Sequence, residues 1–335
     1  MTAPLEVQGS ALEAQPEAVA IAEGHRIEGR SLGQIAWMRL KRDKVALGGG
    51  VIVVCLVIVA VLAPVITALD GQSPYAFHTA LLSRDTLVPF GHFGGISGTH
   101  LLGVEPTSGR DIFARIVYGA RVSLIVALGS TLLAVVIGVF FGGIAGFFGG
   151  IADTFIARTM DLLLSIPQLL FAIALLVIIQ AAPGSFIGLS GSTLHIVVLI
   201  FVIGGFSGPY IGRIIRGQVL SLREKEFVEA ARSMGARSPH ILLRQLLPNL
   251  WAPILVYSTL LIPTNILSEA ALSYLGVGVQ PPTASWGQML SDATSIYQVD
   301  PAYMLVPGLA IFITVMAFNL FGDGLRDALD PRTIR

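Results

Sequence analysis

Five long stretches without a single charged residue decide what this chain can fold into. They cover about 45–69, 122–152, 162–212, 245–268 and 302–322. A helix needs roughly 20 apolar residues to cross about 30 Å of hydrocarbon, so the stretch at 162–212 is long enough for two crossings. The residues at 181–192 are rich in Gly, Pro and Ser and divide it. An all-α membrane protein with six transmembrane helices is predicted, at about 45–68, 121–148, 153–181, 193–215, 249–275 and 302–322.

The composition supports a lipid environment and excludes several other classes. Apolar residues make up 54% of the 335 positions and charged residues 13%, against about 25% charged in an average soluble domain. The formal net charge is zero, so no overall field attracts nucleic acid. Cys55 is the only cysteine, which excludes a disulfide framework and a cysteine-based zinc site. His78, His92 and His100 are irregularly spaced without a matching carboxylate pattern, so no metal site is expected.

The basic residues predict the orientation, because Lys and Arg in short flanking loops stay in the cytoplasm. With the N-terminus inside, 17 Lys and Arg fall on the cytoplasmic side and four on the outer side. Both termini are then cytoplasmic in a multi-pass protein of a bacterial cell membrane. The expected parts are a cytoplasmic N-terminal extension with an amphipathic segment at 1–44, an outer loop at 69–120, a cytoplasmic loop at 216–248 and a tail at 323–335. The first span is too long and too far from the start for a cleaved signal.

Glycines recur every fourth residue in the second predicted span, at Gly138, Gly142, Gly146 and Gly150. A stripe of small residues lets another helix approach closely, which is a main route to helix association in lipid. Packing within this chain is the favoured reading of the stripe. A helix of a partner subunit is the alternative.

The cytoplasmic loop is predicted to form an elbow of two short helices. Apolar residues recur at helical spacing over 223–234, and Gly235 is a typical helix stop. Ser238 and Pro239 are a typical start for a second helix that runs to Pro248. Ala230 and Ala231 leave a shallow face that suits docking into a groove of another protein. A solvated loop that only connects two spans is the alternative.

This loop resembles the EAA loop of bacterial ABC-importer permeases. The likeness rests on Glu-Ala-Ala at 229–231, Gly235, and Leu-Pro at 247–248, with one departure at Gln245, where the older consensus has isoleucine. Further stretches resemble the C-type permease subunit of dipeptide, oligopeptide and nickel systems: His-Leu-Leu-Gly at 100–103, Gly-Arg-Asp at 109–111, Gly-Ala-Arg-Val-Ser-Leu at 119–124, Leu-Gly-Val-Gly-Val-Gln-Pro-Pro at 275–282, Ser-Trp-Gly at 285–287 and Gly-Asp-Gly-Leu-Arg-Asp at 322–327. The resemblance covers about residues 31–335.

The resemblance implies a type I importer permease core at 121–322 whose elbow inserts into an ATPase. The residues implied in coupling are Phe227, Glu229, Ala230, Ala231, Arg232, Met234, Gly235 and Pro248. It also implies a homologous second permease in a heterodimer, one or two ABC ATPases and an extracytoplasmic binding protein. Di- or oligopeptides are the expected cargo, with nickel chelates or other small solutes as the alternative.

The chain itself is not expected to be an enzyme. A nucleotide-hydrolysing chain needs a phosphate-binding loop that ends in Gly-Lys-Ser or Gly-Lys-Thr, and none of the three lysines follows a glycine. ATP and Mg are therefore expected on partner subunits. An intramembrane serine protease is the rival suggested by Gly-Phe-Ser-Gly at 205–208. His195 lies twelve residues before Ser207, about 18 Å along one helix, which is too far for a base.

Polar residues within the spans mark a candidate substrate pathway, because polar side chains that face lipid are costly. They form two groups: Asp161, Ser165, Pro167 and Gln168, and Thr264, Asn265, Ser268 and Glu269. Hydrogen bonds between helices, without solute contact, are the alternative. Outside the spans, Arg110 and Trp286 are candidates for binding-protein docking. A gradient-driven secondary transporter is disfavoured, since no internal repeat is evident.

Overall fold

The computed structural model describes residues 32–91, 94–181 and 191–329, and these are helical apart from loops and two isolated β-bridges. Among these described residues, five helices are long and apolar enough to cross a membrane, and a bent pair counts as a sixth candidate. His92 lies outside the described residues, as do most of the residues at 181–192 that were expected to divide two spans.

The first span is divided rather than continuous. It consists of α3 (Lys44–Val61) and α4 (Ala63–Asp70), with the break at Leu62. Pro64 explains the break, because proline has no N–H to donate and its ring clashes with the preceding helical turn. Before this span, α2 (Leu32–Arg42) packs Ala36 and Leu40 against Ala46 and Ala328. The short helix α2 is therefore attached to the bundle.

The second span, α5 (Ile112–Phe148), begins nine residues before the predicted start at 121. Asp111 caps it, with Oδ1 accepting a hydrogen bond from the Ala114 N–H at 2.7 Å. The basic residues at the start of α5 had favoured a loop up to 120. Arg115 is instead helical and fully buried, so the loop between α4 and α5 is shorter than expected.

The third span is sharply bent. It consists of α6 (Gly150–Ser165) and α7 (Gln168–Ala181), whose axes differ by 79°. Pro167 lies at the break, because proline has no N–H to donate and disfavours the helical conformation of the residue before it. The predicted single helix at 153–181 is therefore wrong, because Pro167 divides it.

The three remaining spans begin within two residues of their predicted first residues. They are α8 (Gly191–Leu222), α11 (Trp251–Tyr274) and α13 (Pro301–Leu329). Two of them run past the uncharged stretches, to 222 rather than 215 and to 329 rather than 322, because charged residues are tolerated in the last helical turns. The described part of the predicted tail is thus helical. A short helix, α12 (Trp286–Ala293), lies between α11 and α13.

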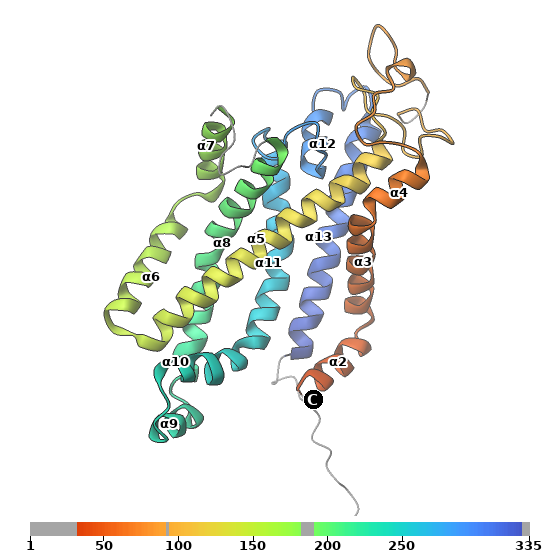
Figure 1. The fold of residues 1–335 in the computed structure, drawn as a ribbon. Helices are drawn as coiled ribbons and strands as arrows, with labels where there is room; N and C mark the ends of the chain where they lie inside the picture. Colours follow the sequence, from red (N-terminus) through yellow and green to blue (C-terminus); the bar gives the residue numbers. More distant parts are fainter. Residues whose placement is uncertain (1–31, 92–93, 182–190, 330–335) are drawn as a thin grey trace, which may run out of the picture.

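Figure 1 shows α5 crossing obliquely over α8 and α11, with α3 and α13 on one side and α6 on the other. At one end of the bundle lie α9, α2 and the last turn of α13, and this is called the elbow end below. The opposite end carries α4, α12 and the loop between α4 and α5 (Figure 1).

The glycine stripe of α5 packs within the chain, against α8. A Cβ on Gly142 would lie 2.4 Å from the Gly212 carbonyl oxygen, and Cβ atoms on Gly138 and Gly146 would also approach α8 closer than 3 Å. Gly150 does not belong to this contact. It starts α6 at a φ of +57° with no neighbouring atom within 4 Å, so its predicted packing role is wrong.

Candidate functional site

The elbow predicted from the sequence is present at one end of the bundle. Its first limb is α9 (Glu226–Ser233), shorter than the predicted 223–234. Gly235 ends it at a φ of +80°, while the Ala236 N–H donates to the Ala231 carbonyl at 3.0 Å. This is a left-handed helix stop that favours glycine.

The two faces of α9 differ in burial. Val228 and Ala231 point inward and are 0% and 3% exposed. Phe227, Ala230 and Met234 are exposed, and Met234 is 81% exposed. The prediction that Ala230 and Ala231 share one shallow face is therefore wrong, because neighbouring helical residues point about 100° apart. The outward apolar stripe, defined by Phe227, Ala230 and Met234, is the feature available to a partner.

The second limb is not one regular helix. It consists of α10 (Ser238–His240), a π-helical turn η2 (Ile241–Leu246) and a 3₁₀ turn η3 (Leu247–Leu250) that runs directly into α11. Ile241, Leu246 and Leu250 form a buried core with the inward face of α9. Glu229, Arg232 and Pro248 are exposed. The limbs are thus held together by apolar packing, and the charged residues stay outside.

The base of the elbow is attached to the turn between α5 and α6. The Arg223 guanidinium donates to the Gly146 carbonyl at 3.0 Å. Arg216 pairs with Asp153 in a two-pronged contact, a geometry that fixes direction as well as distance. These contacts connect the end of α8 to α5 and α6, so a displacement of the elbow would reach both helices.

The polar residues of α11 divide into buried and open positions. Asn265 is fully buried, receives a 3.2 Å hydrogen bond from Ser207 and donates to Thr131 at 2.9 Å. Glu269 is also fully buried and accepts hydrogen bonds from Ser123 at 2.9 Å and Ser273 at 2.7 Å. Because both side chains are fully buried and hydrogen-bonded to other residues of the chain, the structure contradicts their assignment to a pathway wall.

Thr264 is exposed and Ser268 is half-buried, so these two remain candidates for a pathway. The same holds for the group on α6 and α7. Asp161 and Ser165 are exposed, and Pro167 and Gln168 lie at the bend. Asp161 accepts a 2.6 Å hydrogen bond from Arg213 of α8.

The two predicted docking residues are buried at the opposite end of the bundle. Trp286 is 1% exposed and donates its indole N–H to the Ile116 carbonyl at 3.1 Å. Arg110 is 8% exposed and donates to Glu105 Oε2 at 2.7 Å. Neither side chain is open to a docking protein, so these assignments are wrong.

Glu105 is the centre of a buried polar cluster that fastens the loop between α4 and α5 to the bundle. Besides Arg110, it contacts Arg115, and Tyr303 donates to it at 2.8 Å. Arg115 also donates to Gln288 of α12 at 2.7 Å. Asp292 lies at the rim of this cluster, and its pKa is raised, mainly by burial and secondly by the nearby Glu105 carboxylate. The loop, α5, α12 and α13 are thereby joined.

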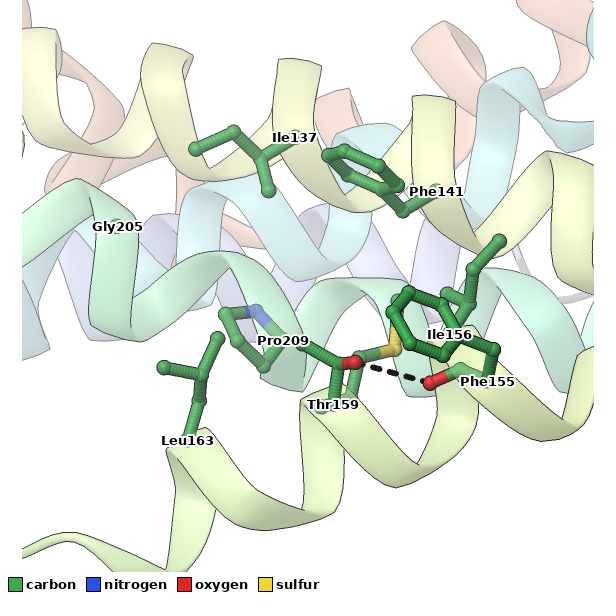
Figure 2. A pocket seen from close by; sticks show the side chains of 9 residues that line it. Ile137, Phe141, Phe155, Ile156, Thr159, Leu163, Gly205 and Pro209 are labelled. Atoms are coloured by element: carbon green, nitrogen blue, oxygen red, sulfur yellow. Dashed lines mark hydrogen bonds between the residues drawn. The ribbon is translucent and has the colours of Figure 1, made fainter. Parts of the chain in front are cut away.

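An apolar groove lies between α5, α6 and α8, with a volume of about 310 Å³. Figure 2 shows Ile137 and Phe141 of α5 facing Phe155 and Leu163 of α6 across it. The one hydroxyl drawn, that of Thr159, donates back to the Phe155 carbonyl at 2.9 Å (Figure 2). This groove therefore offers apolar contact only.

Several residues of the site were not identified from the sequence. Arg213, Arg216 and Asp153 join α6 to α8, and Glu105 organises the outer cluster. A charge inside or beside a predicted span was the available signal, but partners 63 residues apart, as for Arg216 and Asp153, are not visible in local periodicity.

The described residues form a bundle of helices long enough to cross a membrane, with a two-limbed elbow at one end, which is the architecture of a multi-pass membrane protein. The family model described as "Binding-protein-dependent transport system inner membrane component" matches residues 138–335. A second model, described as the N-terminal TM domain of oligopeptide transport permease C, matches residues 31–84. The chain belongs to the family of binding-protein-dependent inner membrane transport components.

Curated relatives agree with this assignment over most of their length. The chain is 39% identical to a dipeptide transport system permease protein of Alkalihalophilus pseudofirmus over 297 residues, which is 89% of each protein. It is 39% identical to a glutathione transport system permease protein of Pectobacterium atrosepticum, covering 88% of this chain and 90% of the relative. An oligopeptide transport system permease protein of Bacillus subtilis is 35% identical, covering 95% and 96%.

A solved structure supports the fold. The inward-facing MetNI methionine ABC transporter contains a chain that matches with a TM-score of 0.52 at 21% identity, covering 65% of this chain and 98% of that one. The fold is that of an ABC type I importer permease, and the resemblance stated from the EAA-like loop is confirmed.

Proposed function

We propose that this permease forms one half of the membrane pathway of an ATP-driven importer for di- or oligopeptides. A homologous second permease supplies the other half, ATPase subunits bind the elbow, and an extracytoplasmic protein delivers the cargo. ATP and Mg are bound by the ATPases. The peptide assignment is supported by relatives named for dipeptide, glutathione and oligopeptide transport.

The outward stripe of α9 carries the coupling part of the proposal. Apolar side chains exposed on a short helix that is otherwise charged favour insertion into a groove of another protein. The inward face of α9 is packed into the limb core, so a partner that moves α9 moves the elbow as a unit. With the elbow in the cytoplasm, as the distribution of basic residues predicts, that partner is an ATPase.

ATP binding supplies the bias between pathway states. A ligand shifts an equilibrium only by its differential affinity for the two states, and the elbow is where this differential contact reaches the membrane. Arg223 and Arg216 then transmit the displacement to α5 and α6. The sharp break at Pro167 lets α6 change its angle to α7, which itself packs on α8 through Leu176, Leu199 and Ile203.

Replacing Met234 with Asp tests the docking of the elbow. If Met234 fills an apolar groove of the ATPase, Met234→Asp should lose about 2 kcal/mol or more of binding free energy, or roughly 30-fold in affinity. The measurement is ATPase co-purification with the permease pair, followed by peptide-stimulated ATP hydrolysis in proteoliposomes.

Gln218→Glu is the matched control, since it adds the same charge at an exposed position of α8 outside the stripe. It should leave co-purification unchanged. If Met234→Asp binds the ATPase as tightly as the unchanged permease, the proposed role of the stripe fails.

A further inference from the structure

The two sides of the seam between α6 and α8 differ in polarity. At the seam itself, Met160 packs against Gly212, where an added Cβ would lie 2.4 Å from the methionine methyl carbon. Thr159 and Asp161, the sequence neighbours of Met160, point about 100° to either side of it around the axis of α6. On the Thr159 side lies the apolar groove of Figure 2. On the other side lies Asp161, paired with Arg213.

Asp161 belongs to a polar stripe along α6. Thr154, Arg158, Asp161 and Ser165 are separated by four, three and four residues, and all four are exposed. This spacing places them on one face of the helix. Within α6, the groove residue Leu163 lies roughly 140° or more from each of these four residues around the helix axis, and Phe155 lies about 120° from Asp161. The stripe is therefore a distinct surface.

The charged pair on this stripe is deep and open. Asp161 is eleven residues from Gly150, the first residue of α6, or about 16 Å along the axis. The Asp161 and Arg213 side chains are 49% and 58% exposed. Half-exposed charges at this depth are too costly against lipid, so such residues face a water-filled space.

Asp161 and Arg213 have hydrogen-bond acceptors and donors that their mutual bond does not use. Within the part of the chain that the structure describes, the side-chain hydrogen bond of Asp161 and Arg213 is their mutual bond of 2.6 Å, and the Arg216 guanidinium lies near enough to act on Asp161 electrostatically. A guanidinium has five N–H donors and a carboxylate accepts about four hydrogen bonds. Arginine binds carboxylates with a two-pronged geometry, and a carboxylate binds ammonium groups. A zwitterion offers both partners.

We infer that Asp161 and Arg213 form a contact point for the charged ends of a peptide in the pathway, with Arg213 binding the terminal carboxylate and Asp161 the terminal ammonium group. This inference rests on the proposed peptide transport and names the groups of the cargo that are recognised. The ion pair between the two side chains keeps both charges in place while no peptide is bound.

The test compares four labelled probes in proteoliposomes with the complete importer: free Ala-Ala, N-acetyl-Ala-Ala, Ala-Ala amide and the doubly blocked peptide. Capture-protein affinities for each probe are measured separately, because one capture protein serves every permease variant. Arg213→Gln should reduce the preference for Ala-Ala over its amide at least tenfold. Asp161→Asn should do the same for Ala-Ala over its N-acetyl form.

Asp153→Asn is the control, because Asp153 joins the same two helices through Arg216 but is only 19% exposed. It should change transport of all probes by one common factor. Basal ATP hydrolysis and co-purification with the ATPase report whether each variant assembles. The conservative variant Asp161→Glu should retain the preference for a free amino end.

The outcomes separate two failures. If the unchanged importer moves Ala-Ala but Asp161→Asn and Arg213→Gln slow all probes equally, the pair is only a link between helices and the inference is overturned. If the unchanged importer hydrolyses ATP but moves none of the peptides, the proposed cargo fails and the inference fails with it.

Discussion

Gly142 makes the closest approach of the three stripe glycines that pack on α8, and replacing it with alanine is the sharpest test of this packing. The new Cβ would lie 2.4 Å from the Gly212 carbonyl oxygen and 3.0 Å from its Cα and carbonyl carbon. An ordinary contact needs about 3.4 Å, so the helices must separate by about 1 Å. Overpacking of this kind costs about 1–3 kcal/mol.

Gly143→Ala is the matched control for Gly142→Ala. Its Cβ would meet only the end of Leu242, at 3.9 Å. Both variants gain the same helix propensity, about 1 kcal/mol relative to glycine. The difference between them therefore isolates the contact with α8, at about 1–3 kcal/mol.

The assay is the apparent melting temperature of the purified permease pair in detergent. At about 2–4 °C per kcal/mol, Gly142→Ala should melt roughly 2–12 °C below Gly143→Ala. Transport should also fall in Gly142→Ala, because α8 carries the elbow at its end. Equal melting temperatures for the two variants would refute the assigned close contact.

Two further predictions concern the elbow and the outer cluster. Gly235→Val should abolish coupled transport without preventing membrane insertion, because a β-branched residue is strained at a φ of +80°. Gly235→Asn should retain more transport, since asparagine tolerates this conformation. Equal transport by the two variants would argue against an effect of the backbone conformation. For Asp292, the raised pKa means that the folded state favours the protonated form, so its contribution to stability is present at low pH and is lost as the pH rises through the raised value. Asp292→Asn should therefore flatten the fall in melting temperature that begins as the pH rises above the ordinary carboxyl pKa of about 4, and an unchanged pH profile would contradict the assigned burial effect.

The spans and the elbow could be read from the sequence because they depend on local properties. Hydrocarbon thickness sets the length of an uncharged stretch, and Gly235 stops a helix through its own backbone freedom. The EAA-like loop could be recognised for the same reason, because its motif lies within one short segment of the sequence. The prolines at the two breaks, Pro64 and Pro167, are also present in the sequence, although each of these spans was predicted as one continuous helix.

Burial was decided only by the tertiary structure. Ala230 and Ala231 are adjacent in sequence, yet one faces outward and the other fills the limb core, because the second limb packs on one side of α9 only. Asn265, Glu269, Trp286 and Arg110 all looked accessible and are buried. Their surroundings come from distant segments, as with Tyr303 and Glu105, which are 198 residues apart.

What the sequence by itself determined is therefore the number and approximate position of the spans, the elbow and the family. The three-dimensional packing decided which polar residues bind one another and which stay open, as Asp161 and Arg213 do. The physical reason is that the free-energy cost of a charge in lipid depends on the residue itself, so it shows in the local sequence. A buried hydrogen bond also needs a partner, which only the folded chain brings to a distance of about 3 Å.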